Sequence, residues 1–221
     1  AARRPFAHTL VVRKTEFKTS GAVTPSIQAL YAALAADERR NRLILNDVVQ
    51  ALEQGRSPIL LTERTDHLEY FATRLQKLAR HLIVLQGGMG AKERRKAKDR
   101  LAAIQNGEER LVLATGRYIG EGFDDARLDT LFLALPVSWK GTLIQYTGRL
   151  HRLHPGKTEV QIFDYVDRDV PMLLRMFERR LRGYRAIGYA RGEAPLGYSE
   201  SGDEPIVEYD EEALRHFDDA D

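Results

Sequence analysis

The chain has 221 residues, of which 43% are hydrophobic and 30% are charged. This composition suffices for one large domain with a buried core. No apolar run reaches the ~20 residues that cross a membrane, and no N-terminal segment resembles a secretory signal peptide. The chain contains no cysteine, which excludes disulfides, thiolate metal sites and cysteine nucleophiles and agrees with a reducing compartment. We therefore expect a cytoplasmic protein without a membrane partner.

Charge is distributed unevenly along the chain. Residues 200–221 contain ten acidic residues and one basic residue, a net charge of −9. Since the whole chain carries +2, residues 1–199 carry about +11. A basic body with an acidic tail fits a protein that binds a polyanion such as nucleic acid. The alternative is a protein with a solvated acidic tail, which charge alone does not exclude.

The predicted elements begin with a strand at residues 8–17, where β-branched residues alternate with polar ones. Two helices follow at 26–35 and 37–54, the second starting at a cap residue, Asp37, and ending at Gly55. Beyond them strands and helices alternate. The further strands span 59–62, 82–85, 111–114, 130–135 and 160–165, and the further helices span 66–81, 91–106, 139–152 and 169–187.

This alternation predicts a parallel sheet with helices on both faces, and ligands of such sheets bind at the carboxyl ends of the strands. We divide the chain into an N-terminal strand with a connecting segment (1–36), a main lobe (37–190) and an acidic, flexible tail (191–221). The tail prediction depends on its low apolar content.

Two arginines stand out in the run Gln-Tyr-Thr-Gly-Arg-Leu-His-Arg at residues 145–152. Arg149 and Arg152 are three residues apart, which places them on one face of a helix. A guanidinium fork fits a phosphate with two hydrogen bonds and keeps its charge. The alternative is a pair of surface arginines in an ordinary ion-pair pattern.

A second motif lies about twenty residues upstream. Ala114 and Thr115 end an apolar run and are followed, after a spacer, by the segment Glu121-Gly122-Phe123-Asp124. In this order the two motifs resemble motifs V and VI of superfamily 2 helicases and translocases, and the resemblance covers roughly residues 40–190. It implies a RecA-like three-layer αβα sandwich with a mainly parallel sheet. The style of both motifs is closer to the DNA repair and restriction branch than to the RNA helicases.

The motifs of a first motor lobe are missing from the sequence. There is no G-x-x-x-x-G-K-[ST] loop, and no Asp-Glu-x-His or Asp-Glu-x-Asp follows an apolar strand. A nucleotide hydrolase needs both a phosphate loop and a carboxylate for magnesium. The chain therefore resembles the second lobe of an ATP-dependent helicase or translocase. ATP and Mg²⁺ would be held mainly by a first lobe of the same parent protein, and this chain alone would be inactive.

The resemblance assigns a nucleotide side to the lobe. Arg149 and Arg152 would be arginine fingers, and Gln145 would help to order the cleft. The residues on the cofactor side would be Gly122, Asp124, Glu121 and Gly148, with Gly148 allowing close approach of the helix. Asp124 could instead be a loop carboxylate that forms a turn. Glu121 could orient a finger or form a plain salt bridge.

The resemblance also assigns a nucleic-acid side, which grips the sugar–phosphate backbone without reading sequence. Its residues would be Thr115, Thr62, Arg64, Gly87, Gly88 and Arg117. The two arginines could equally be solvated, and we interpret the basic helix at 91–106 as an exposed face. DNA is the favoured partner and RNA the alternative. The six histidines show no metal-ligand spacing, so we predict no metal site.

Two other functional classes compete with this interpretation. A nucleic-acid-binding module with the same fold and no ATP coupling would have no need of the arginine pair or of Asp124. A doubly wound enzyme of another kind would need a glycine-rich turn after its first core strand, where this chain has Glu63-Arg64-Thr65 instead.

Overall fold

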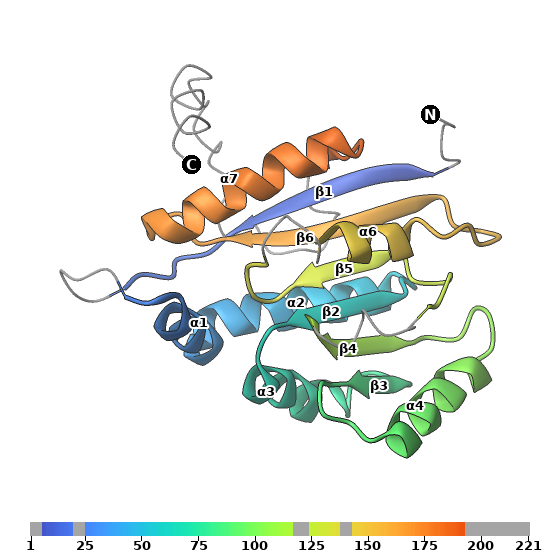
Figure 1. Cartoon of the computed structure of the whole chain (residues 1–221). Coiled ribbons are helices and arrows are strands. Elements are labelled where there is room, and N and C mark those ends of the chain that lie inside the picture. The colour runs from blue at the N-terminus through green and yellow to red at the C-terminus, as the bar shows by residue number, and fades with distance from the viewer. Residues whose placement is uncertain (1–5, 20–24, 117–123, 138–142, 193–221) are drawn as a thin grey trace.

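The computed structural model describes residues 6–19, 25–116, 124–137 and 143–192. They form one seven-stranded sheet in the order β3-β4-β2-β5-β6-β1-β7, and every pairing is parallel (Figure 1). The strands are β1 Ala7–Lys14, β2 Pro58–Thr62, β3 Leu82–Leu85, β4 Leu111–Thr115, β5 Thr130–Leu133, β6 Glu159–Val166 and β7 Ala190–Gly192.

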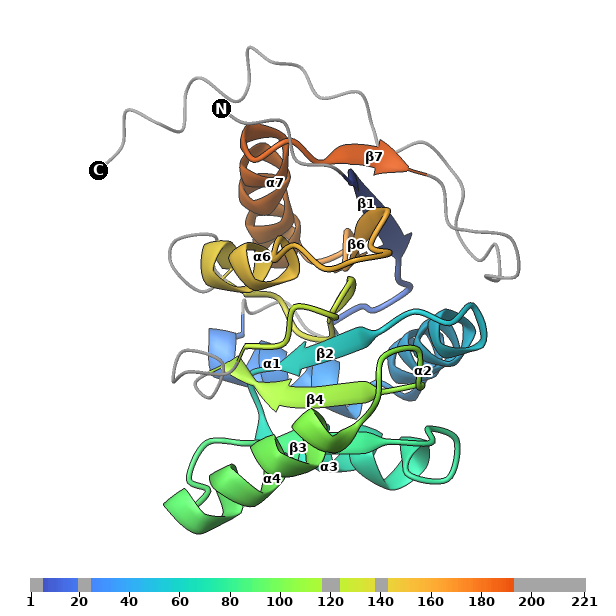
Figure 2. The same ribbon diagram turned by 90° about the vertical axis from the view of Figure 1, so that its right-hand side faces the viewer.

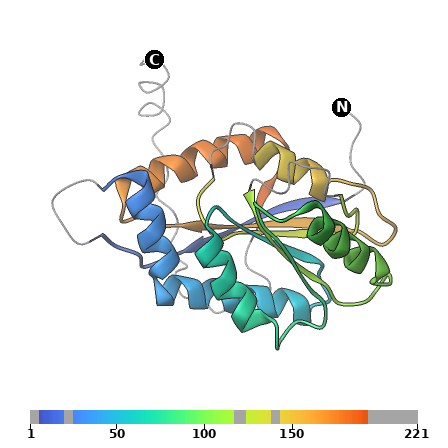
Figure 3. The same cartoon turned by 60° about the horizontal axis from the view of Figure 1, so that its bottom comes forward.

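Helices cover both faces of the sheet, as Figures 2 and 3 show. The helices are α1 Ile27–Ala36, α2 Glu38–Glu53, α3 Thr65–Leu75, α4 Ala91–Ala103, α6 Ile144–Leu150 and α7 Pro171–Ala186. One core cluster joins the sheet to α2 and α3, and another joins the opposite face to α4, α6 and α7. The predicted αβα sandwich with a parallel sheet is therefore confirmed.

The uniformly apolar sequences of β2, β4 and β5 explain why these strands lie in the centre of the sheet. Every residue of β2, β4 and β5 is buried, with no alternation between an inner and an outer face. A strand covered by helices on both sides requires this pattern. The predicted start of α2 is also present, because the Asp37 carboxylate accepts a hydrogen bond of 2.7 Å from the backbone N–H of Arg40.

Helix α3 and strand β7 differ from the predicted elements for identifiable reasons. We expect α3 to reach residue 81, but it ends at Leu75. The apolar spacing continues to Leu78, yet the chain leaves the helix and the Leu78 residue is 59% exposed. Strand β7 is not predicted, because its three residues at the sheet edge carry no apolar pattern. It pairs with β1, and a Cβ on Gly192 would overlap the Thr9 side chain, so only glycine fits there.

The N-terminal strand is part of the same sheet as the main lobe. β1 lies between β6 and β7, with Leu10 opposite Ile162 and Arg191. Residues 7–14 and 190–192, which flank the predicted main lobe, therefore complete its sheet.

Three buried arginine–aspartate pairs fasten helices to β1 and to the end of β6. Each aspartate also accepts a hydrogen bond from a tyrosine or threonine hydroxyl. The pairs are Arg13 with Asp47, Arg40 with Asp167 and Arg180 with Asp164, with N–O distances of 3.0, 3.0 and 2.7 Å. Burying such a pair costs much of what its attraction gains, so its main effect is to penalise any arrangement that separates the charges.

The pair on α7 is the most fully bonded. Asp164 accepts hydrogen bonds from Nε and Nη2 of Arg180 at 2.7 and 2.8 Å and from the Tyr184 hydroxyl at 2.9 Å. Both charged side chains are 1% exposed. The arrangement fixes α7 against β6.

A neutral hydrogen-bond chain joins the end of β2 to α1, α2 and α3. The ring of His67 lies 3.0 Å from the Thr62 hydroxyl through Nδ1 and 2.8 Å from Asn41 Oδ1 through Nε2. The Asn41 amide nitrogen donates to the Ala35 carbonyl at 2.8 Å, so the amide oxygen faces the ring. Nε2 therefore carries the hydrogen and Nδ1 accepts from Thr62. Burial lowers the pKa of His67 to about 3, so the ring stays neutral.

The substitution Asp164→Asn should lower the free energy of unfolding by about 3–5 kcal/mol, because it leaves the Arg180 guanidinium buried without its counter-charge. Urea unfolding followed by circular dichroism measures the change. Asp169→Asn is the matched control, since it removes the exposed partner of Lys18 and should change little. Equal effects of the two substitutions would contradict the anchoring role.

Because of His67, the folded protein should become less stable as the pH is lowered. The pKa of the folded state lies below the usual 6.5, so below pH 6.5 the unfolded chain takes up a proton that the folded chain refuses. His67→Gln removes this effect. The difference in free energy of unfolding between wild type and variant should shrink by ~2 kcal/mol from pH 7 to pH 5. Asp47, whose pKa burial raises to about 6, acts in the opposite direction but is common to both proteins. Urea titrations at both pH values make the comparison, and an unchanged difference would show that His67 does not titrate this way.

Candidate functional site

Helix α6 presents the arginine pair. Its inner face is buried through Tyr146, Thr147 and Leu150, which fixes its rotation on the sheet. Gln145 and Gly148 are exposed and Arg149 is half-buried. The helix ends at Leu150, which is earlier than predicted. Arg152 therefore follows the cap residue His151 in a turn, where it still lies on the side of Asp124.

Arg149, Arg152 and Asp124 form a small charge cluster. Nη2 of Arg152 lies 3.2 Å from the Asp124 carboxylate, and the two side chains are 61% and 47% exposed. Burial lowers the pKa of Arg149; Asp124 opposes this shift and Arg152 adds to it. Arg149 makes no ion pair with any other residue that the structure describes. The cluster therefore combines one weakly paired and one partly desolvated guanidinium, an arrangement suited to an anion.

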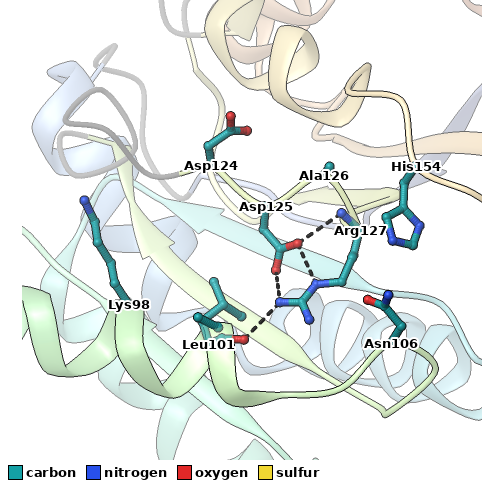
Figure 4. A pocket seen from close by; sticks show the side chains of 9 residues that line it. Lys98, Leu101, Asn106, Asp124, Asp125, Ala126, Arg127 and His154 are labelled. Carbon is teal, nitrogen blue, oxygen red and sulfur yellow. Dashed lines mark hydrogen bonds and ion pairs between the residues drawn. The ribbon is translucent and has the colours of Figure 1, made fainter.

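A hollow of about 460 Å³ opens beside Asp124 (Figure 4). Its wall is held by Arg127, which bonds the Asp125 carboxylate at 2.7 and 2.8 Å and also donates to the carbonyls of Leu101 and Ile104. These bonds fasten the loop before β5 to the end of α4 and so fix the position of Asp124. The hollow is lined by Lys98, Leu101, Ala102, Asn106, Asp124, Asp125, Ala126, Arg127 and His154.

The carboxyl ends of β2, β3 and β4 bring together three of the residues predicted to grip nucleic acid. Thr62 and Thr115 are opposite each other in the register of β2 and β4. The backbone N–H of Gly87 donates to the Thr115 hydroxyl oxygen at 2.9 Å. Gly88 has a φ of 89° and open space where a side chain would lie.

Two of the predicted side chains, those of Thr62 and Arg64, are occupied by partners within the lobe. The Thr62 hydroxyl donates to His67, and Arg64 bonds the Asp66 carboxylate through Nε at 2.9 Å and Nη2 at 2.5 Å. The Thr115 hydroxyl differs, because it accepts from Gly87 and its hydrogen has no acceptor among the described residues.

A contact that the sequence analysis missed joins the strand ends to α6. The Tyr146 hydroxyl donates to the Gly116 carbonyl at 2.7 Å, and burial raises the pKa of Tyr146. A Cβ on Gly116 would overlap both the Glu63 carboxylate and the Tyr146 hydroxyl, so any other residue here would force both side chains to move. In the sequence Tyr146 is only one buried position of a helix, and no short-range pattern indicates its partner.

Three predicted site residues, Glu121, Gly122 and Arg117, lie outside the described residues. A Cβ on Gly148 would meet nothing within 4 Å among the described residues. The close approach that we expect at Gly148 is therefore not an approach of α6 to any of these residues. In the described ranges, no three acidic or histidine side chains gather as a metal site requires. No helix in the same ranges is long and apolar enough to cross a membrane.

Residues 41–154, more than half of the chain, match the model of the helicase conserved C-terminal domain. The transcript termination protein A18 of vaccinia virus (strain Ankara) is 29% identical over 121 residues, and the variola virus transcript termination protein OPG145 is 30% identical over the same length. Each match covers 54% of this chain and 24% of the viral protein. The chain therefore spans about a quarter of the length of these relatives.

Solved structures share the fold. T4 UvsW superposes with a TM-score of 0.63 and 16% identity, over 86% of this chain and 41% of that one. Dbp5 of S. cerevisiae superposes with a TM-score of 0.55 and 13% identity, over 86% of this chain and 42% of that one. These superpositions confirm the predicted RecA-like fold. The family match shows that the chain belongs to the helicase conserved C-terminal domain family.

Proposed function

We propose that the chain is the second motor lobe of an ATP-dependent helicase or translocase. It would supply Arg149 and Arg152 to ATP that a first lobe binds, and it would grip the nucleic-acid backbone. The observation that carries the proposal is the charge cluster on α6, in a chain whose sequence has no phosphate-binding loop of its own.

The chemistry requires positive charge where phosphoryl transfer develops negative charge. In the transition state the charge spreads over the γ-phosphoryl oxygens, and an arginine finger there is worth ~10³–10⁵ in rate. The bond between Arg152 and Asp124 is exposed at both ends, and such pairs contribute at most about 1 kcal/mol. A phosphate group can therefore replace Asp124 as the partner of Arg152 at little cost.

The residues around the cluster fit a triphosphate with its Mg²⁺ ion held from the other lobe. Arg149 is partly desolvated and lacks an ion-pair partner among the described residues, which suits an anion. The exposed Gly148 leaves the α6 surface open to a group from outside the chain. Asp124 and Gly122 would contact the ribose side of the nucleotide, and Gln145 would help to order the cleft. Glu121 would orient a finger arginine or form a salt bridge.

The nucleic-acid grip would use the carboxyl ends of β2, β3 and β4. Thr115 has a hydroxyl hydrogen to donate to a phosphate, and the amide of Gly87 lies beside it. Gly88 would allow the backbone to approach the phosphate closely. Thr62 would act indirectly, since its hydroxyl is bound to His67. Arg64 would have to leave Asp66 before it could bind a phosphate, and Arg117 would add a further contact.

The relatives support a nucleotide and a nucleic acid as ligands. The Dbp5 structure contains RNA and ADP BeF3, and the poxvirus relatives are named for transcript termination. The motif style favours DNA for this chain, with RNA as the alternative. The cytoplasm would be its location, which agrees with a chain without cysteine. A nucleic-acid-binding module without ATP coupling remains the competing function, and it predicts no effect of the arginine pair on hydrolysis.

Arg152→Ala in the full-length protein should reduce the kcat of ATP hydrolysis ~10³-fold or more, because the transition state loses a positive charge. Steady-state hydrolysis with saturating nucleic acid measures it. Arg182→Ala, on the exposed face of α7, is the control and should retain wild-type kcat. Unchanged hydrolysis by Arg152→Ala, with its thermal unfolding also unchanged, would remove the finger role.

Thr115→Val should weaken nucleic-acid binding about tenfold, because a hydrogen bond to a charged phosphate is lost. Fluorescence anisotropy of a labelled oligonucleotide with the 221-residue chain measures the Kd. Thr115→Ser keeps the hydroxyl and should bind like wild type. The logarithm of the Kd should rise with the logarithm of salt concentration, equally for unrelated sequences. A salt-independent Kd, or equal binding by the two variants, would contradict this grip.

A further inference from the structure

The ammonium group of Lys157 caps the end of α6, the helix that carries Arg149 and is followed by Arg152. Its Nζ donates to the Leu150 carbonyl at 3.0 Å and to the Arg152 carbonyl at 2.9 Å. The last carbonyls of a helix have no partner within the helix, and a cation there also meets the negative end of its dipole. One side chain therefore holds the backbone on both sides of His151.

Lys157 is itself held in place by a tight turn. Its backbone N–H donates to the His154 carbonyl at 3.1 Å, and Gly156 adopts a φ of 84°, which a side chain would strain. The ammonium lies 5.8 Å from the centre of the Phe6 ring. Burial lowers the pKa of Lys157, as expected for a cation that has exchanged water for carbonyl partners.

The arginine side chains have little support of their own. The one bond of Arg152 to a described side chain is the exposed pair with Asp124, and Arg149 has no ion pair among the described residues. The positions of both guanidinium groups therefore depend on the backbone of residues 149–152. Within the turn, the His151 N–H donates to the Thr147 carbonyl at 3.0 Å and also to the Arg149 carbonyl, and the Arg152 N–H donates to the Arg149 carbonyl at 3.1 Å.

We propose that Lys157 is a positioning residue for the arginine pair, which fixes the backbone turn from which Arg152 projects. This inference rests on the proposed finger role of Arg149 and Arg152. Lys157 does not touch the nucleotide. Its effect is on kcat, because a displacement of about 1 Å in a catalytic group can cost ~100-fold in rate.

The experiment compares Lys157→Met and Lys157→Arg in the full-length protein. Methionine keeps an unbranched chain without the donors, and arginine keeps the charge and the donors. We expect Lys157→Met to lower the kcat of ATP hydrolysis about 10–100-fold with the KM for ATP within about twofold, and Lys157→Arg to recover most of the loss. Lys92→Met, at an exposed position of α4, is the control and should leave both constants unchanged.

A double substitution separates positioning from general loosening. In an Arg152→Ala background, Lys157→Met should have little further effect on kcat, because the group that it positions is gone. A full additive loss in that background would overturn the inference. So would a wild-type kcat for Lys157→Met, or a change confined to KM.

Thermal unfolding of each variant gives the remaining comparison. If Lys157→Met lowers the unfolding midpoint, we replace it by Lys157→Gln and compare the kcat of that variant with the kcat of Lys157→Arg. Glutamine keeps a hydrogen-bond donor on a shorter side chain. A wild-type kcat for Lys157→Gln together with Lys157→Arg then supports the inference, and an equal loss for both overturns it. A failure of the proposed function can be distinguished from a failure of this inference. If the finger role is wrong, Arg152→Ala alone retains wild-type ATP hydrolysis.

Discussion

The hydrogen bond from Tyr146 to the Gly116 carbonyl is the contact on which the organisation of the site depends. It is 2.7 Å long and joins α6, which carries the arginine pair, to the end of β4, which carries Thr115. Removing the hydroxyl would leave the partly buried Gly116 carbonyl without this partner. Gly116 has no room for a side chain between Tyr146 and Glu63. In the proposed function, a ligand that displaces Gly116 would therefore also displace α6.

The remainder of the fold holds this contact in place. Parallel strands deliver Thr62, Thr115 and the Gly87 amide to one edge of the sheet, and helices on both faces keep the strands buried. The Asp164–Arg180 pair fixes α7 against β6, next to the face on which α6 packs. The polar groups at the ends of the helices and strands thus set the geometry of the site, while the apolar layers stabilise the sheet.

The central strands and the order of elements could be predicted, because uniformly apolar runs between turn residues are short-range signals. The spacing of the motif residues identifies them in the sequence, and their roles stay predictions. Tyr146 and His67 could not be assigned partners, because Gly116 and Asn41 lie 30 and 26 residues away in sequence. The three-residue β7 has no hydrophobic alternation that predicts a strand. Nothing in the sequence distinguishes Lys157 from an ordinary lysine in a turn. Glu121, Gly122 and Arg117 stay predictions, since they lie outside the described residues.

The central claim is that this lobe completes an ATP site that it does not contain. The most direct measurement is ATP hydrolysis by the 221-residue chain alone, with and without nucleic acid, and then with the first lobe added as a separate protein. We predict no hydrolysis by the chain alone, and hydrolysis on mixing that is lost when the chain carries Arg149→Ala. Robust hydrolysis by the chain alone would contradict the claim, because it would require a phosphate site within these residues.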